Sequence, residues 1–150
     1  MGHTETVDPI NLTEKFLFVG GGGGTSSFVV EDGPGIWREL MGGEMSDTAK
    51  RMVTEDGFLM TQGTVGVDSG SQWEIHPEGD EILTLLEGAV DVYFEQEDGS
   101  IRICPLRMPG TVCRVPPNTW HTSKLPPGET KEGKLNFFTF GRGTRHKVVE

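Results

Sequence analysis

Apolar residues along this chain fall into short runs that alternate with polar residues, and clusters of Gly, Pro, Asn and Asp separate the runs. Such alternation is typical of β-strands with one buried face. The pattern predicts strands over residues 15–19, 27–30, 36–41, 58–67, 72–76, 81–86, 90–95, 101–105, 111–115 and 134–140. Only residues 44–53 are predicted to form a short helix. The sequence therefore favours an all-β sandwich or barrel.

Composition supports one turn-rich domain. The chain has 150 residues, enough to bury a core without disulfides or metals as staples. Its Gly 22 and Pro 9 favour many turns over long helices. We expect a single domain over residues 1–150.

The net charge of -10 limits the partners that the chain can bind. Phosphate groups would be repelled, so we expect neither nucleic acid nor an anionic membrane surface as a partner. No apolar stretch approaches the length of a membrane-spanning helix, and the polar, acidic first ten residues do not resemble a secretory signal. We therefore expect a cytoplasmic protein whose Cys104 and Cys113 are free thiols, although a disulfide across a hairpin would also suit their spacing.

A glycine run over residues 20–24 follows the apolar stretch FLFV, as phosphate-binding loops do. The GxxxxGK[ST] pattern is absent, and the following TSSFVV is typical of a strand rather than a helix. A flexible hairpin loop is therefore the preferred interpretation.

The stretch WEIHPEGDE over residues 73–81 holds one histidine among four acidic residues. If residues 72–76 form a strand, Glu74 and His76 share one face and point the same way. After a tight turn, Glu81 begins an otherwise apolar strand face, where a buried carboxylate needs a partner. His121 follows a proline-rich turn in VPPNTWHT, also at the start of a strand. These residues can converge on one divalent cation, whereas a lone His–Glu pair beside a turn is more often a solvated surface feature.

The wider spacing resembles the cupin superfamily of small β-barrels. Its first motif, G(X)5HXH(X)3-4E(X)6G, is similar to GSQWEIHPEGDEILTLLEG, with His76, Glu81 and Gly88 at the family positions. Its second motif, G(X)5PXG(X)2H(X)3N, is similar to GTVCRVPPNTWHTSKL, with Pro116 and His121 in place. The 21 residues between the motifs, 89–109, leave room for the usual pair of strands.

Four positions depart from the family pattern. Three residues, rather than five, separate Gly70 from Glu74, and Glu74 stands where the first histidine belongs. Asn118 replaces a turn glycine, which asparagine tolerates because it accepts left-handed backbone conformations. Leu125 replaces the final asparagine. Only the change at Glu74 affects the chemistry of the site.

The resemblance implies a cupin-type jelly-roll fold, with N-terminal strands over 15–41 and the motif-bearing barrel over about 58–140. It implies one divalent metal ion held by Glu74, His76, Glu81 and His121. Two carboxylates favour Mn²⁺ or Fe²⁺, while Ni²⁺ and Zn²⁺ stay possible. Alternatively, His76, His121 and one carboxylate form a facial triad, which frees Glu74 to act as a base. A third interpretation is a lost site, in which the two carboxylates repel each other without metal.

Strand alternation suggests further residues for a substrate pocket. Gln62, Phe138 and Phe140 are expected to face it, and Arg114 is a candidate to hold a substrate carboxylate or to pair with a surface acid. The preferred function is a metal-dependent enzyme acting on a small organic molecule, of the dioxygenase, isomerase/cyclase or lyase type. The alternative is a non-catalytic small-ligand-binding cupin with a structural or absent metal. The resemblance also implies a homodimer, with the N-terminal strands over residues 15–30 as the candidates for exchange between the subunits.

Overall fold

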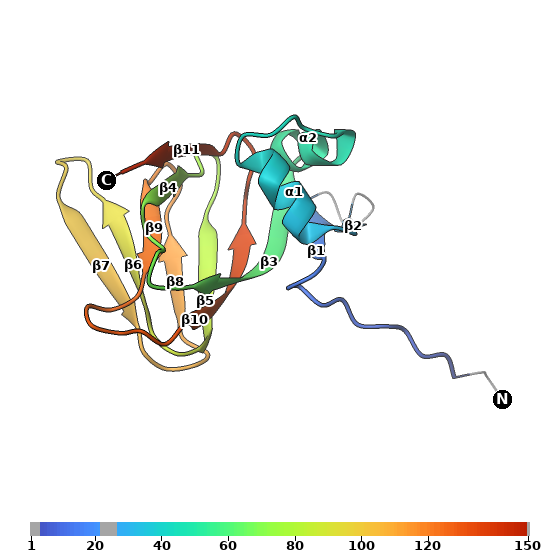
Figure 1. Cartoon of the computed structure of the whole chain (residues 1–150). Coiled ribbons are helices and arrows are strands. Elements are labelled where there is room, and N and C mark those ends of the chain that lie inside the picture. Colours follow the sequence, from blue (N-terminus) through green and yellow to red (C-terminus); the bar gives the residue numbers. More distant parts are fainter. Residues whose placement is uncertain (1–3, 22–26, 150) are drawn as a thin grey trace.

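The computed structural model describes residues 4–21 and 27–149, and in this part of the chain two antiparallel sheets face each other (Figure 1). One sheet has six strands in the order β2-β1-β3-β10-β5-β8, and the other has five in the order β11-β4-β9-β6-β7. The six strands are β1 (Phe16–Gly20), β2 (Phe28–Val30), β3 (Gly57–Val65), β5 (Glu81–Glu87), β8 (Val112–Val115) and β10 (Gly133–Thr139). The five are β4 (Gln72–Ile75), β6 (Val90–Glu95), β7 (Ile101–Leu106), β9 (His121–Lys124) and β11 (Arg145–Val148).

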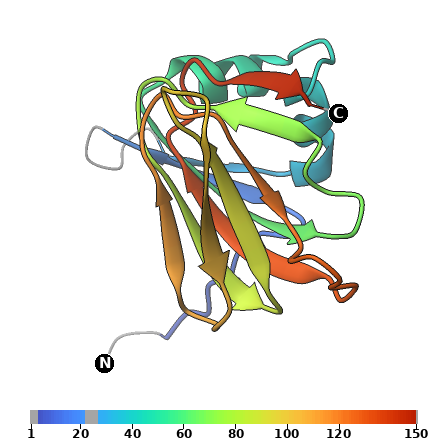
Figure 2. The ribbon, with the colours of Figure 1, turned by 90° about the vertical axis from the view of Figure 1, so that its left-hand side faces the viewer.

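The main core lies between the two sheets, which form the two sides of an open barrel (Figure 2). Alternate residues along each strand face inward, as Leu83 and Leu85 do on β5 and Leu135 does on β10. Their side chains are at most 1% exposed, and burial of this kind stabilises each by roughly 1.5–3 kcal/mol. The sheets do not close into one hydrogen-bonded cylinder within the described residues. The prediction of an all-β barrel of antiparallel strands is confirmed.

A strand predicted over residues 36–41 is wrong, because this segment forms most of helix α1 (Gly33–Leu40). The Asp32 carboxylate accepts a hydrogen bond from the Gly35 amide at 2.9 Å and caps the helix, and Pro34 occupies its first turn. Ile36 and Leu40, four residues apart, then lie on one helix face. A six-residue alternation was too short to reveal this helical spacing.

A second, smaller core lies where the two helices cover the end of the six-stranded sheet (Figure 1). The predicted helix over 44–53 exists as α2 (Asp47–Thr54), capped by the Ser46 hydroxyl. Its Ala49 and Met52 pack with residues of β1, β2 and α1. No helix in the described part of the chain combines the length and apolar character that crossing a membrane requires. The glycine run extends into residues 22–24, which lie outside the described residues.

Strand β11 was not predicted, since the sequence RHKV shows no apolar alternation. It pairs with β4 in the register Arg145 to Ile75 and His146 to Glu74. This pairing places the C-terminal segment beside the candidate metal ligands.

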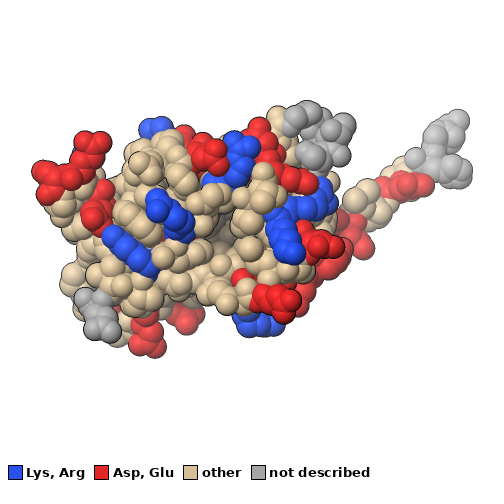
Figure 3. Space-filling model, turned by 90° about the horizontal axis from the view of Figure 1, so that it is seen from above, with Lys and Arg blue, Asp and Glu red and all other residues tan. Residues whose placement is uncertain are grey.

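Charged side chains of both signs are interspersed over the surface (Figure 3). Several form exposed ion pairs, such as Arg51 with Glu55 and Lys15 with Glu31. Pairs of this kind contribute little to stability. The positions of the barrel strands are therefore set by core packing and by the turns between strands.

The turn before β9 depends on a left-handed residue. Asn118 has φ 57, and its amide donates a hydrogen bond to the His76 carbonyl at 2.9 Å. This contact joins the loop that precedes His121 to the loop that follows β4. Asn118 therefore adopts the left-handed conformation that suits the glycine of the family motif at this position.

We predict that Asn118→Gly changes the free energy of unfolding by less than about 0.5 kcal/mol, whereas Asn118→Val lowers it by about 1–2 kcal/mol, because β-branched residues disfavour left-handed conformations. Urea unfolding measures both values. Asn136→Val on extended strand β10 is the matched control and is expected to be tolerated. Equal losses for the two valine variants would contradict the prediction.

Candidate metal centre

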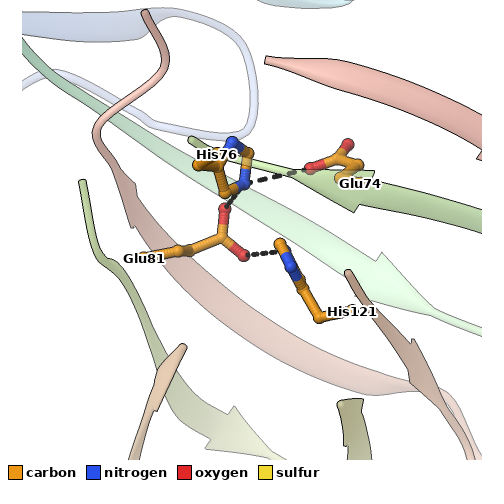
Figure 4. A group of neighbouring side chains, drawn as sticks. All are labelled: Glu74, His76, Glu81 and His121. Atoms are coloured by element: carbon orange, nitrogen blue, oxygen red, sulfur yellow. Dashed lines mark hydrogen bonds and ion pairs between the residues drawn. The ribbon is translucent and has the colours of Figure 1, made fainter. Parts of the chain in front are cut away.

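Four side chains converge between the sheets (Figure 4). Glu74 lies on β4 and His76 directly follows it, while Glu81 begins β5 and His121 begins β9. One potential ligand atom from each residue lies within 4.8 Å of the other three. The structure thus brings together all four residues that the sequence singled out.

These groups are deeply buried for ionisable side chains. His76, Glu81 and His121 are each 3% exposed, whereas the side chain of Glu74 is 20% exposed. Buried charges require partners, because desolvation of an isolated ion is costly. The four residues can supply such partners to one another, to neighbouring polar groups or to a shared cation.

Each imidazole has its Nδ1 atom committed to a neighbour outside the cluster. His121 Nδ1 lies 2.9 Å from the Thr119 carbonyl, which can only accept, so this nitrogen carries the proton. His76 Nδ1 lies 2.8 Å from the Thr144 hydroxyl, which itself donates to the Gly141 carbonyl. The same tautomer follows for His76. In both neutral rings the Nε2 lone pair therefore points into the cluster.

The Glu81 carboxylate lies between the two Nε2 atoms, with Oε1 3.1 Å from His121 and Oε2 2.9 Å from His76. Despite that short distance, His76 Nε2 is buried and has no well-aligned hydrogen-bond partner. A lone pair facing a carboxylate is repelled unless a proton or a metal ion lies between them. Nδ1 atoms anchored to backbone or hydroxyl groups and converging Nε2 atoms are typical of metal-binding histidines. The donor set therefore fits a divalent cation.

Comparison with known proteins identifies the fold. A scan against protein-family models and a search of curated proteins both find no match. Among solved structures, an oxalate decarboxylase matches with a TM-score of 0.51 at 15% identity, over 63% of this chain and 24% of that chain. A single-residue mutant of the Bacillus subtilis oxalate decarboxylase gives the same values. Peruvianin-I, described as a cysteine peptidase from Thevetia peruviana latex, matches with a TM-score of 0.50 at 17% identity, over 62% and 56% of the two chains.

The fold is that of the cupin superfamily. This confirms the resemblance drawn from the two motifs. The chain spans about a quarter of the oxalate decarboxylase chain and just over half of the peruvianin-I chain. At these identities the likeness establishes the fold alone. The chemistry must be inferred from the residues of this chain.

In this cupin fold, the residue that replaces the first motif histidine has a partner of its own. One oxygen of Glu74 lies 3.5 Å from His76 Nε2, and the other lies 3.3 Å from His146 Nε2. His146 belongs to the unpredicted strand β11, and its polar terminal segment gave no sign of a site. The contact of His146 with Glu74 becomes evident only from the pairing of β11 with β4, which sets the two residues opposite each other.

A cavity of about 810 Å³ opens beside the cluster, and Glu74, His76, Glu81 and His121 all line it. Gln62 also lines it, as expected. Its other walls come from β3, from the region of α1 and α2, and from the segment that precedes β4. The volume suits a small organic molecule.

Three expected pocket residues lie elsewhere. Phe138, Phe140 and Arg114 line a separate, shallow depression outside the barrel. Strand alternation on β10 turns Phe137 and Thr139 toward the cavity, so the choice of face was wrong for Phe138. Arg114 forms two hydrogen bonds with the Asp80 carboxylate, at 3.0 and 3.1 Å, so it pairs with a surface acid.

The metal-free cluster perturbs its own titration. Burial alone would lower the pKa of His76, but the close carboxylates of Glu74 and Glu81 outweigh it and raise this pKa from 6.5 to about 9. Burial would raise the pKa of Glu81, yet its contacts with His121 and His76 hold it well below the usual value. Protonated histidine and ionised glutamate thus stabilise each other when no metal is bound.

We predict that the metal-free protein is most stable between about pH 5 and 6.5 and loses stability toward pH 9. The raised pKa of His76 means that its stabilising charge is fully present below 6.5 and is lost as pH rises through about 9. The lowered pKa of Glu81 means that its contribution is lost only in acid. The loss toward pH 9 should be at most about 3 kcal/mol. Urea unfolding of chelator-treated protein at several pH values measures it.

Metal-loaded protein should show the opposite trend from about pH 6 to 8, because ligation requires neutral imidazoles. His76→Gln provides the control, since it should flatten the alkaline limb of the metal-free curve. The free energy of unfolding of the metal-free wild type could instead stay level or rise between pH 6.5 and about 9. That result would contradict the raised pKa of His76.

Proposed function

We propose that this chain is a metal-dependent enzyme that acts on a small organic molecule. The observation that carries the proposal is the pair of anchored imidazoles, whose Nε2 atoms converge with two carboxylates beside an 810 Å³ cavity. Buried ligands next to a cavity of this size allow a bound molecule to reach the ion. The proposed reaction class is a dioxygenase, an isomerase or cyclase, or a lyase.

In this proposal His76, His121 and Glu81 hold one divalent cation. The ion would supply Lewis acidity or a site for O₂. With Glu74 as a fourth ligand the centre has two nitrogen and two carboxylate donors, which favour Mn²⁺ or Fe²⁺, with Ni²⁺ and Zn²⁺ as further candidates. With both carboxylates ionised, the loaded centre would carry no net formal charge.

Glu74 has the features of either a fourth ligand or a general base. It is the most exposed of the four and lines the cavity, where it can meet a bound molecule. Contacts with His146 and His76 lower its pKa against the effect of burial, so it is ionised at neutral pH. An ionised, oriented carboxylate at a cavity wall can accept a proton from a substrate.

The names of the similar structures offer limited guidance. Oxalate decarboxylase is an enzyme with this fold, which supports an enzymatic role here by analogy. The peptidase description of peruvianin-I does not extend to this chain. Cys113 is buried, and burial raises its thiol pKa well above the ordinary value, so it would be a weak nucleophile.

The alternative is a non-catalytic small-ligand-binding protein with a structural or absent metal. One observation favours it: Glu81 lies within 3.1 Å of both imidazoles, so protonated histidines can neutralise the cluster without an ion. The same cavity would then only bind its ligand. The enzyme requires a bound metal ion with a coordination position open to solvent. The binding protein has either no metal ion or one whose coordination positions are all filled.

Metal content by mass spectrometry on untagged protein tests the proposal. We predict near-stoichiometric metal in the wild type and an affinity lowered by more than about 100-fold in Glu81→Gln, because that variant removes a charged ligand. Glu78→Gln is the matched control, since Glu78 pairs with Arg142 on the surface. Absence of metal after supplementation with Mn²⁺, Fe²⁺, Ni²⁺ and Zn²⁺ would overturn the proposed centre.

Water-proton relaxation on the Mn²⁺-loaded sample then separates enzyme from binding protein. Strong enhancement by exchanging water indicates an open coordination position and supports the enzyme. Weak enhancement indicates a closed, structural ion and supports the alternative. In Glu74→Gln, a metal affinity equal to that of the wild type would show that the Glu74 carboxylate is not a ligand, which leaves it available as the base.

Two further expectations remain proposals. We infer a homodimer and a cytoplasmic location, as stated from the sequence and its resemblance. In the structure, β1 pairs with β2 and β3 of its own chain, so no exchange of N-terminal strands is needed to complete the sheet. Light scattering on purified protein gives the oligomeric state directly.

A further inference from the structure

We propose that the ligand of the cavity has one polar end that meets the metal centre and an uncharged, apolar remainder that lies against Trp37, Met41 and Met45. The polar end rests on the proposed function, whereas the apolar remainder rests on these apolar lining residues alone. The ligand class is therefore a small molecule with a single polar head, such as an aromatic or branched aliphatic compound bearing an oxygen donor.

An apolar part of the cavity wall is built by the helical segment. Trp37 and Leu40 come from α1, Met41 and Met45 from the connection to α2, and Met52 from α2 itself. Trp37 is 41% exposed and Met45 is 38% exposed, so this wall keeps apolar surface accessible. Methionine and tryptophan at one wall give an adaptable apolar surface for a flat or branched group.

No Lys or Arg is among the residues that line this cavity in the described part of the chain. Basic side chains nearby are turned to the surface, where Arg142 binds Glu78 and Lys147 binds Glu95. A second anionic group on the ligand would thus find no cationic side chain in the cavity wall.

The acids in the lining reinforce this selection. Glu74 and Glu81 lie at the metal centre, and Asp68 lies in the segment before β4. Because a bound cation would neutralise Glu74 and Glu81, Asp68 is the acid in the lining that would repel a second carboxylate or phosphate, and that group would also lose solvation in the cavity.

A matched pair of probes tests the inference. Benzohydroxamic acid and 4-carboxybenzohydroxamic acid share the same metal-binding head and differ only in a distal carboxylate. We predict that the uncharged probe binds the Zn²⁺-loaded protein about tenfold more tightly, as titration calorimetry would measure, because the extra carboxylate loses solvation without gaining a cationic partner. Since the head is common to both probes, its contact with the metal cancels in the ratio.

Methyl NMR of ¹³C-methionine-labelled protein locates the apolar part. The methyl signals of Met41 and Met45 should shift on addition of benzohydroxamic acid, and Met45→Ala should weaken binding by about fivefold or more. Met108→Ala is the matched control, because Met108 is 67% exposed and does not line the cavity. Met45 and Met108 are both surface-accessible, so both variants should fold.

The metal content of the same sample keeps the two proposals separable. Bound metal with equal affinity for the two probes overturns this inference and leaves the metal centre intact. A second outcome is a sample without metal in which the Met41 and Met45 signals still respond more strongly to benzohydroxamic acid. That outcome supports the apolar contact with Met41 and Met45 and overturns the proposed function. Shifts confined to Met108 or absent from all methionines would overturn the apolar wall.

Discussion

The Glu81 carboxylate bridges two buried imidazoles, and the surrounding fold keeps those three groups in register. Each oxygen faces one Nε2 atom, and the Thr139 hydroxyl donates a further hydrogen bond to Oε2 at 2.7 Å. Three ionisable groups this deeply buried are tolerated only when each has a partner. Because β5, β9 and the end of β4 supply them separately, the two sheets must hold their relative positions for the cluster to exist.

The helical segment has a different role from the barrel. Apart from its contribution to the cavity wall, it forms a satellite core with β1 and β2, built on buried residues such as Phe18, Ile36 and Met52. The side chains of Glu74, His76, Glu81 and His121 are therefore placed by the barrel, and the apolar part of the cavity wall is placed by an addition to it. This division lets one chain combine a polar centre and an apolar surface within one space.

Much of this arrangement could be predicted from local patterns. Turn residues and the two motif spacings located Glu74, His76, Glu81 and His121, because each stands at a junction that the turns define. Other features depend on tertiary contacts. The partnership of His146 with Glu74 arises from the pairing of β11 with β4, which polar sequence does not reveal. The inward face of β10 was misjudged because alternation gives two faces and leaves unstated which of them meets the core.

The central claim is that His76 and His121 present their Nε2 atoms to a metal ion while Nδ1 keeps its proton. ¹⁵N NMR of the histidine side chains during Zn²⁺ titration of metal-free protein tests it directly. We expect the Nε2 resonances of both residues to shift to values typical of metal-bound nitrogen, with the Nδ1–H signals retained. Spectra that stay unchanged with excess Zn²⁺, or that show binding through Nδ1, would contradict it.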